Sequence, residues 1–215
     1  MIRRLISLSG VPAASRFAAI TLLIGMLGFA GCSAAATATT RVSYIAPVTE
    51  TGELASTYSI TSSYRGTCSG SSAVASGGPV YRCATSKFLI DPCWRLQRST
   101  TTLVCLANPY THEVVEVRSS SVPPHVNGPY LKKDPWGIEL ASGTKCHAFG
   151  GSPDQFKGQF VRFICSGSLS LLDDLNDTKQ PWTIQVVRYN IKTNEYSSLG
   201  FQKIASVTYA GPGPK

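Results

Sequence analysis

Cysteine is the residue type with the most chemistry to offer in this chain of 215 residues. The chain has seven cysteines, an odd number, so complete disulfide pairing leaves one over. The first of them ends the run Phe29-Ala30-Gly31-Cys32, which has the form of a bacterial lipobox, in which the cysteine thiol is acylated. If Cys32 carries a lipid, six cysteines remain and can all pair. The cysteine count therefore supports lipid attachment at Cys32 independently of the motif.

The six remaining cysteines are expected to form three disulfides, because an exported chain meets an oxidising environment. Six cysteines allow fifteen connectivities, so the sequence alone does not decide between them. A turn-containing segment separates each successive pair, and neighbouring antiparallel strands joined in this way bring Cα atoms within a bridging range of roughly 4.4 to 6.8 Å. We therefore predict pairing in chain order: Cys68 with Cys83, Cys93 with Cys105, and Cys146 with Cys165.

The segment that precedes Cys32 has the pattern of an export signal. Arginines near the start are followed by an apolar run from residue 17 to residue 30, interrupted only by Thr21. That run is shorter than the roughly 20 apolar residues that a membrane-spanning helix needs. We predict that residues 1–31 are a lipoprotein signal peptide and that the lipid, palmitate included, holds the chain at the extracytoplasmic face of the cell membrane.

Two alternatives remain open for export. Leucine is the usual residue at the first lipobox position, where this chain has Phe29, so ordinary secretion with cleavage near residues 34–36 is the competing interpretation. The pair Arg3-Arg4 also allows twin-arginine export, although its neighbours fit that motif poorly. Loss of residues 1–31 removes three of the 20 basic residues and none of the 12 acidic ones, so the net charge falls from +8 to +5.

Two short motifs match catalytic patterns, and each has a structural interpretation that we prefer. Residues 66–70, Gly-Thr-Cys-Ser-Gly, have the shape of a nucleophile elbow, but no helix pattern follows and Cys68 is needed for disulfide pairing. Residues 142–145, Ser-Gly-Thr-Lys, match S-x-x-K, but they fit a hairpin turn better. We therefore expect no catalytic residue in either motif and a protein that is not an enzyme.

The sequence gives no metal or cofactor signature. The three histidines, His112, His125 and His147, have no spacing that would place two imidazoles on one ion. His147 beside Cys146 offers a zinc site in principle, but disulfides are the expected state of cysteines in this compartment. We expect no metal and no cofactor.

Basic residues alternate with aromatic ones between residues 81 and 98, which is typical of a surface that binds anionic polymers. No nucleic-acid fold signature is present, so we expect no nucleic-acid partner. Anionic envelope polymers or lipid headgroups are the partner class that this face would fit; a solvated strand face with scattered charges is the simpler interpretation. The residues are Tyr81, Arg82, Lys87, Phe88, Trp94, Arg95 and Arg98.

Short β-rich runs separated by turn residues recur from Val80 to the end of the chain, with no helix pattern between them. Several alternate with period two, as expected for strands with one buried face. This favours an all-β fold, an antiparallel sandwich or barrel-like domain cross-linked by three disulfides. The predicted strands are 80–84, 87–90, 101–106, 113–118, 136–141, 145–149, 159–165, 182–189 and 201–209, with turns at Ser142-Gly143 and Thr193-Asn194.

The domain boundaries follow from composition. Residues 32–63 are predicted to be the lipid anchor and a flexible tether, because residues 33–41 contain nothing large enough to pack into a core; a further strand is allowed between residues 42 and 62. Residues 64–215 form the predicted disulfide-bonded β domain. Within it we expect loops at 66–78 and 119–135, and the only helical pattern is the short run 169–175.

From residue 66 to residue 209 the chain resembles a set of uncharacterised secreted and lipid-anchored actinobacterial proteins with a six-cysteine β domain. The resemblance implies export, a β fold and paired cysteines, and it implies no reaction. It rests on R-C-A-T at 82–85, I-D-P-C-W at 90–94, L-V-C at 103–105, P-W-G-I-E-L-A-S-G-T-K-C at 135–146 and P-W-T-I at 181–184.

Three functional hypotheses follow. The leading one is a non-catalytic, lipid-anchored cell-envelope protein that acts as a binding or structural module and contacts the membrane through its N-terminal lipid. A second is an extracytoplasmic hydrolase whose residues come from scattered loops. A third is a protease-inhibitor-like module that presents the proline-rich loop 119–135. The side chains that converge in the largest pocket would discriminate between them.

Overall fold

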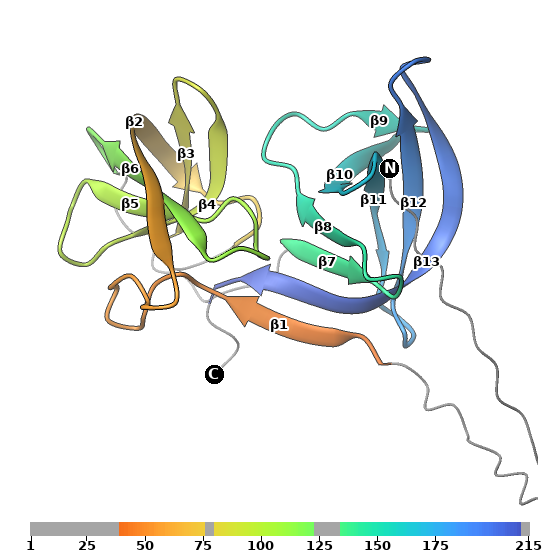
Figure 1. Cartoon of the computed structure of the whole chain (residues 1–215), viewed down its shortest axis with the longest axis horizontal. Coiled ribbons are helices and arrows are strands. Elements are labelled where there is room, and N and C mark those ends of the chain that lie inside the picture. Colours follow the sequence, from red (N-terminus) through yellow and green to blue (C-terminus); the bar gives the residue numbers. More distant parts are fainter. Residues whose placement is uncertain (1–38, 76–79, 123–133, 212–215) are drawn as a thin grey trace, which may run out of the picture. The chain divides into compact units, whose positions relative to one another are not determined.

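The computed structural model describes residues 39–75, 80–122 and 134–211 (Figure 1). In these ranges the chain forms thirteen β-strands and no helix, which confirms the predicted all-β class. The predicted signal peptide, Cys32 and most of the predicted 119–135 loop lie outside the described residues. Within the described ranges no helix is long and apolar enough to cross a membrane.

Five consecutive strands form a closed barrel in chain order. Its neighbouring strands are antiparallel, but the pair that closes it, β2 with β6, is parallel. The odd number of strands requires this, because the first and fifth strands of an up-and-down meander run in the same direction. The strands are β2 (Ser59–Ser71), β3 (Val80–Thr85), β4 (Leu89–Arg95), β5 (Thr102–Cys105) and β6 (Glu113–Ser119).

Six later strands form a second ring, in the order β7-β8-β10-β11-β12-β13. Here the closing pair, β13 with β7, is antiparallel like the others, as an even number of strands allows. The strands are β7 (Gly137–Leu140), β8 (Lys145–Ala148), β10 (Gln159–Cys165), β11 (Leu169–Asn176), β12 (Thr183–Asn190) and β13 (Glu195–Ala210).

Two short strands extend this second barrel. β9 (Gln155–Phe156) forms a hairpin with the start of β10. β1 (Arg41–Ile45) runs parallel to the end of β13, from Ser206 to Ala210. Because β12 pairs with β13 only as far as Lys203, β1 continues the hydrogen-bonding along β13 beyond the point where β12 ends.

Each barrel has its own buried cluster. The cluster of the five-stranded barrel has eight buried members, and four of them are cysteines: Cys68, Tyr81, Cys83, Ile90, Cys93, Leu103, Cys105 and Val117. The cluster of the six-stranded barrel is aliphatic and aromatic with one cysteine, Cys146, and includes Ile138, Phe163, Leu171, Ile184, Val186, Val207 and Tyr209.

A third cluster joins outward-facing side chains of the five-stranded barrel to residues beside β7 and β13. Leu103 and Cys105 of β5 point into the barrel, while Val104 between them belongs to this third cluster. At its centre the rings of Trp94 and Trp136 lie 6.1 Å apart, and both side chains are almost completely buried. Strand β5 is therefore buried on both faces, which explains why its sequence, T-L-V-C, is almost entirely apolar.

The structure adds to the local predictions in one place and differs from them in two. β1 and the first part of β2 lie within residues 32–63, where the sequence allows a further strand. The predicted loop at 66–78 is strand as far as Ser71, since its small residues pair with β3. The run 169–175, which has a helical pattern too short for an independent helix, is part of strand β11. Leu171 belongs to the main cluster of the six-stranded barrel and Leu172 to a separate cluster with Val161 and Val187, while the carboxylates of the strand are exposed.

The predicted turns agree with the structure. Gly143 has φ of 84° in the β7–β8 hairpin, a conformation that suits glycine. Asn194 has φ of 58° at the tip of the β12–β13 hairpin, and asparagine tolerates this region better than most residues. Strand β13 starts at Glu195, six residues earlier than predicted, because its first residues pair with the end of β12.

Candidate functional site

The six described cysteines form three disulfides in chain order, as the sequence predicts. Each disulfide joins two residues that lie directly opposite each other on neighbouring strands, and the Cα–Cα distances are 4.0, 3.9 and 4.1 Å. Cys68–Cys83 links β2 to β3, Cys93–Cys105 links β4 to β5, and Cys146–Cys165 links β8 to β10. With all six paired, no cysteine within the chain is left to pair with Cys32.

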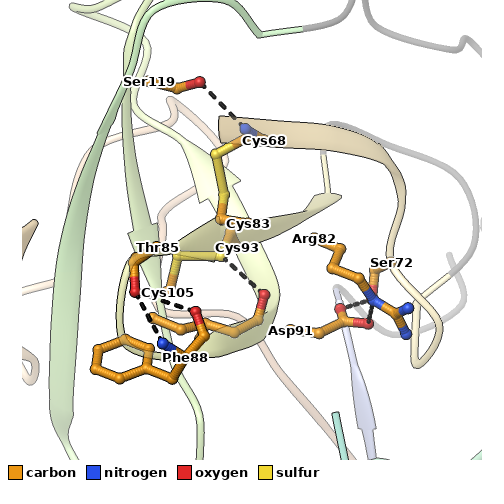
Figure 2. The surroundings of a disulfide bond; sticks show 11 residues. Cys68, Ser72, Arg82, Cys83, Thr85, Phe88, Asp91, Cys93, Cys105 and Ser119 are labelled. Atoms are coloured by element: carbon orange, nitrogen blue, oxygen red, sulfur yellow. Dashed lines mark hydrogen bonds and ion pairs between the residues drawn. A yellow bond between two sulfur atoms is a disulfide. The ribbon is translucent and has the colours of Figure 1, made fainter. Parts of the chain in front are cut away.

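Two of the disulfides lie side by side inside the five-stranded barrel (Figure 2). The sulfur atoms of Cys83, Cys93 and Cys105 are all within 4.8 Å of one another, and these three residues have no exposed surface. Three thiolates at such distances would suit a metal ion, but sulfur atoms joined in disulfides are not thiolate ligands. As oxidised here, the cluster is a pair of cross-links.

A buried carboxylate lies next to these cross-links. Asp91, whose side chain is 2% exposed, accepts hydrogen bonds from the Ser72 hydroxyl and from the backbone N–H of Ala73, the latter at 2.7 Å. It also pairs with Arg82 at 3.2 Å (Figure 2). The Ser72 hydroxyl oxygen in turn accepts hydrogen bonds from the backbone N–H groups of Val74 and Ala75. Asp91 therefore fixes the segment that follows β2, and the contacts it makes with described residues are structural.

The six-stranded barrel has a cavity of about 830 Å³ at one of its ends. This is the end at which β7, β10 and β12 begin and β8, β11 and β13 finish, as the strand register requires. Apolar side chains of the barrel core, Phe163, Leu175 and Tyr209, line it from inside, and Ala73 lines it from the segment that Asp91 fixes. The mouth of a barrel is a common place for ligands to bind.

Charged side chains surround this cavity. Asp134 pairs with Arg162 at 2.6 Å, so their charges offset each other. Asp173 and Asp177 add two further carboxylates, and Asp173 is exposed with no hydrogen bond or ion pair to any described residue. The cavity rim is therefore negative, although the chain as a whole carries a net charge of +8.

The electrostatic effect of this rim is visible at Tyr209. Burial, followed by the neighbouring Tyr44, Asp177 and Asp134, raises the pKa of Tyr209 to about 12. Tyr44, from β1, stacks on the Tyr209 ring at 5.5 Å and packs against the same buried cluster. The phenol of Tyr209 is thus neutral at physiological pH, and the local environment disfavours additional negative charge.

The catalytic motifs of the sequence do not assemble into sites. Ser142 lies in the exposed β7–β8 turn, where its hydroxyl is 3.1 Å from that of Thr144, while the Lys145 amino group lies over the ring of Tyr110. Cys68, the centre of the Gly-Thr-Cys-Ser-Gly motif, is bonded to Cys83. A Ser–Lys pair and a cysteine nucleophile are therefore both ruled out at these positions.

The histidines are separated as well. His112 packs edge-on against Tyr58, with ring centroids 5.5 Å apart. His147 is half-buried on β8, and burial lowers its pKa. Its neighbour Cys146 is part of a disulfide, so the two do not form a zinc site. His125 lies outside the described residues.

The predicted face of alternating basic and aromatic residues does not exist as one surface. Its aromatic members Tyr81 and Trp94 are buried in two different clusters. Three of its four basic members are engaged separately: Arg82 with Asp91, Arg98 with Glu53 at 2.5 Å, and Lys87 over the ring of Tyr64 at 5.5 Å.

The acidic residues of the cavity were not identified from the sequence. Asp173 and Asp177 belong to the run Asp-Asp-Leu-Asn-Asp at 173–177, which holds three of the chain's 12 acidic residues. That concentration of negative charge in a basic chain was the signal by which these cavity residues could have been found in the sequence. The sequence does not show that Asp134 and Arg162, far from this run in the chain, lie at the same cavity.

Comparisons with protein-family models, with curated proteins and with solved structures gave no significant match to this chain. The resemblance to secreted and lipid-anchored actinobacterial proteins therefore stays a prediction.

Proposed function

We propose that this chain is a non-catalytic, lipid-anchored binding module of the bacterial cell envelope, and that it binds its ligand at the mouth of the six-stranded barrel. The observation that carries the proposal is the cavity of about 830 Å³ with an apolar interior and a charged rim. A largely apolar pocket with a few converging polar groups is the usual form of a small-molecule site.

Support for the anchor comes from the N-terminal sequence and from the cysteines. The lipobox-like run ends at Cys32, and the six later cysteines bond to one another. Acylation would account for a seventh cysteine in an exported chain without a reactive free thiol. The two proposals, anchor and cavity, are separable because one concerns residue 32 and the other the folded body.

Support for binding without catalysis comes from the composition of the cavity. Among the described residues that line it there is no serine, cysteine or histidine, so the Ser–His or Cys–His pair of an acyl-transfer enzyme is not gathered there. Its functional groups are three carboxylates, one guanidinium and one phenol. These groups bind and orient a ligand through charge and hydrogen bonds.

The charge of the rim specifies the ligand's sign. Three aspartates surround the cavity against one arginine, and that arginine is already paired with Asp134. An anionic polymer would be repelled by this excess of carboxylates, whereas an ammonium group would pair with Asp173, which has no hydrogen bond or ion pair to any described residue. We therefore propose an aliphatic amine, with its cation at Asp173 and its hydrocarbon portion toward Leu175, in place of the anionic polymers considered from the sequence.

The anchor is tested by metabolic labelling with a fatty acid. Wild-type protein should incorporate the label and fractionate with membranes, and Cys32→Ala should do neither. Equal labelling of the two proteins, or a wild-type mature N-terminus that lies beyond Cys32, would contradict the anchor.

The cavity is tested by calorimetric titration of the purified protein with spermidine. Replacement of the unpaired Asp173 by asparagine should weaken binding roughly tenfold, because a charge-assisted contact of about 1.4 kcal/mol is lost. Asp174→Asn is the matched control, since Asp174 is the next residue on the same exposed part of β11 but does not line the cavity. Equal weakening by both variants, or tight binding of polyphosphate in place of spermidine, would contradict the proposed site.

A further inference from the structure

The four cysteines of the five-stranded barrel lie on four consecutive strands. In the register of the sheet, Cys68 on β2 faces Cys83 on β3, and Cys93 on β4 faces Cys105 on β5. The second sulfur of the first disulfide, that of Cys83, lies within 4.8 Å of both sulfurs of the second disulfide. Figure 2 shows the two S–S bonds next to each other between these strands. The third disulfide belongs to the other barrel and its cluster contains no further cysteine besides its own pair.

We propose that this arrangement is a thiol–disulfide exchange site, which is opened at Cys68 by a low-molecular-weight thiol and continues internally from Cys83 to the Cys93–Cys105 disulfide. Exchange proceeds by attack of a thiolate on a disulfide sulfur, so it needs a thiolate within contact range of a second disulfide. The inference is independent of the proposed ligand at the barrel mouth.

Cys68 is the entry point because it is the only one of the four with exposed surface, 4% against 0% for the others. The β2–β3 ladder is also irregular next to it, with a register shift between Ser69 and Ser71. Such a shift leaves a residue without its ladder partner and loosens the pairing locally. An external thiol therefore reaches Cys68 with a smaller local opening than it would need for any of the other three.

The first step is attack on Cys68 by the external thiolate. A bond forms between the thiol's sulfur and the Sγ of Cys68, the Cys68–Cys83 bond breaks, and its electron pair leaves on Cys83 as a thiolate. No net oxidation occurs, because one disulfide is replaced by a mixed disulfide and one thiolate by another.

The second step is internal. The Cys83 thiolate attacks a sulfur of the Cys93–Cys105 disulfide, a new disulfide from Cys83 forms, and the displaced cysteine leaves as the thiolate. The number of disulfides and thiolates is again unchanged. The sulfur distances place both Cys93 and Cys105 within reach, so the thiolate moves from β3 to β4 or β5 without large backbone movement.

The experiment uses Cys68→Ser, which leaves Cys83 as a thiol next to the second disulfide. The protein is held under non-reducing conditions, quenched with acid, alkylated and digested with trypsin. Cleavage after Arg82, Lys87, Arg95 and Arg98 places Cys83, Cys93 and Cys105 on three different peptides. The alkyl group marks the free thiol. The expected result is that it is found on Cys93 or Cys105 in place of Cys83, and that a disulfide-linked peptide joins Cys83 to whichever of Cys93 and Cys105 is not alkylated.

The matched control is Cys146→Ser, which leaves Cys165 as a thiol in the barrel that has no second disulfide. All of its label should remain on Cys165, and the other two disulfides should be intact. If the label of Cys68→Ser also stays entirely on Cys83 with Cys93–Cys105 intact, the exchange site is wrong.

A second measurement covers the case in which Cys68→Ser does not fold. Wild-type protein is treated under native conditions with less than one equivalent of glutathione and analysed in the same way. The proposal expects glutathione on Cys68 and a new thiol at Cys93 or Cys105. It is overturned if glutathione sits on Cys68 while the thiol remains on Cys83, if Cys146–Cys165 is reduced first, or if no disulfide reacts.

Discussion

The two barrels of this chain close and fill their interiors differently. The five-stranded barrel closes through the parallel pair β2–β6, and half of its buried cluster is cysteine. The six-stranded barrel closes through an antiparallel pair, is filled by aliphatic and aromatic side chains, and has one disulfide. The described cavity with a charged rim lies at the mouth of the six-stranded barrel.

The two barrels differ in how much space they enclose. A five-stranded ring encloses little volume, because barrel diameter grows with strand number, and two disulfides with a few side chains fill it. Six strands hold a larger apolar cluster, and at one end that cluster gives way to a cavity. We interpret the small barrel as the part held together by covalent bonds, and the larger one as the part that offers a ligand site.

The largest expected effect is removal of a disulfide from each barrel in turn. Cys146→Ala/Cys165→Ala should lower the free energy of unfolding by about 3 kcal/mol through the loss of loop restriction. Cys93→Ala/Cys105→Ala should cost about 4 to 5 kcal/mol, because both of its cysteines are fully buried in a small core, whereas only Cys146 of the other pair is fully buried. Urea unfolding followed by far-UV circular dichroism measures both. Equal losses would mean that the two barrels do not differ in how much they depend on disulfides.

Two ion pairs, one in each barrel, allow a second comparison, in which the expected losses in the free energy of unfolding are smaller. Asp91 pairs with Arg82 in the small barrel and its side chain is 2% exposed, whereas Asp134 pairs with Arg162 at the cavity and is 60% exposed. Asp91→Ala should cost about 2 to 3 kcal/mol, because it leaves buried donors without an acceptor. Asp134→Ala should cost less than about 1 kcal/mol, as for other exposed pairs. Chemical denaturation of both variants decides the order, and the reverse order would contradict the structural role assigned to Asp91.

The smallest effect is a pH dependence that belongs to the six-stranded barrel. Burial lowers the pKa of His147 below its ordinary value of 6.5. The unfolded chain therefore takes up a proton at this position before the folded one does, and stability falls as the pH drops from 6.5 toward the folded pKa. His147→Gln should flatten the stability profile in this window. An unchanged slope would show that other groups are responsible.

The strand pattern and the disulfide connectivity were predictable from local sequence. Period-two alternation and turn residues are short-range signals, and most strands from residue 80 onward lie within a few residues of their predicted positions. The chain-order disulfides follow because each joins neighbouring strands across a single connection, which is the case that a local argument covers.

The rest depends on contacts between distant residues. Strand β1 forms only because β13, more than 160 residues later, has an open edge beyond the end of β12. Closure into two rings depends on strand number and register, which no single segment encodes. The cavity draws on segments from Ala73 to Tyr209, and the run 169–175, whose local pattern hints at a helix, becomes a strand because β10 and β12 pair on either side of it.

The most direct test of the central claim, that the six-stranded barrel carries the ligand site, is an amide NMR titration of the ¹⁵N-labelled protein with spermidine. Binding at the barrel mouth should give concentration-dependent shifts at Asp134, Arg162, Asp173, Asp177 and Tyr209, and none along β3 to β5 of the five-stranded barrel. Shifts centred on the five-stranded barrel would contradict a ligand site in the six-stranded barrel. So would spectra of wild type and Asp173→Asn that both stay unchanged when spermidine is added.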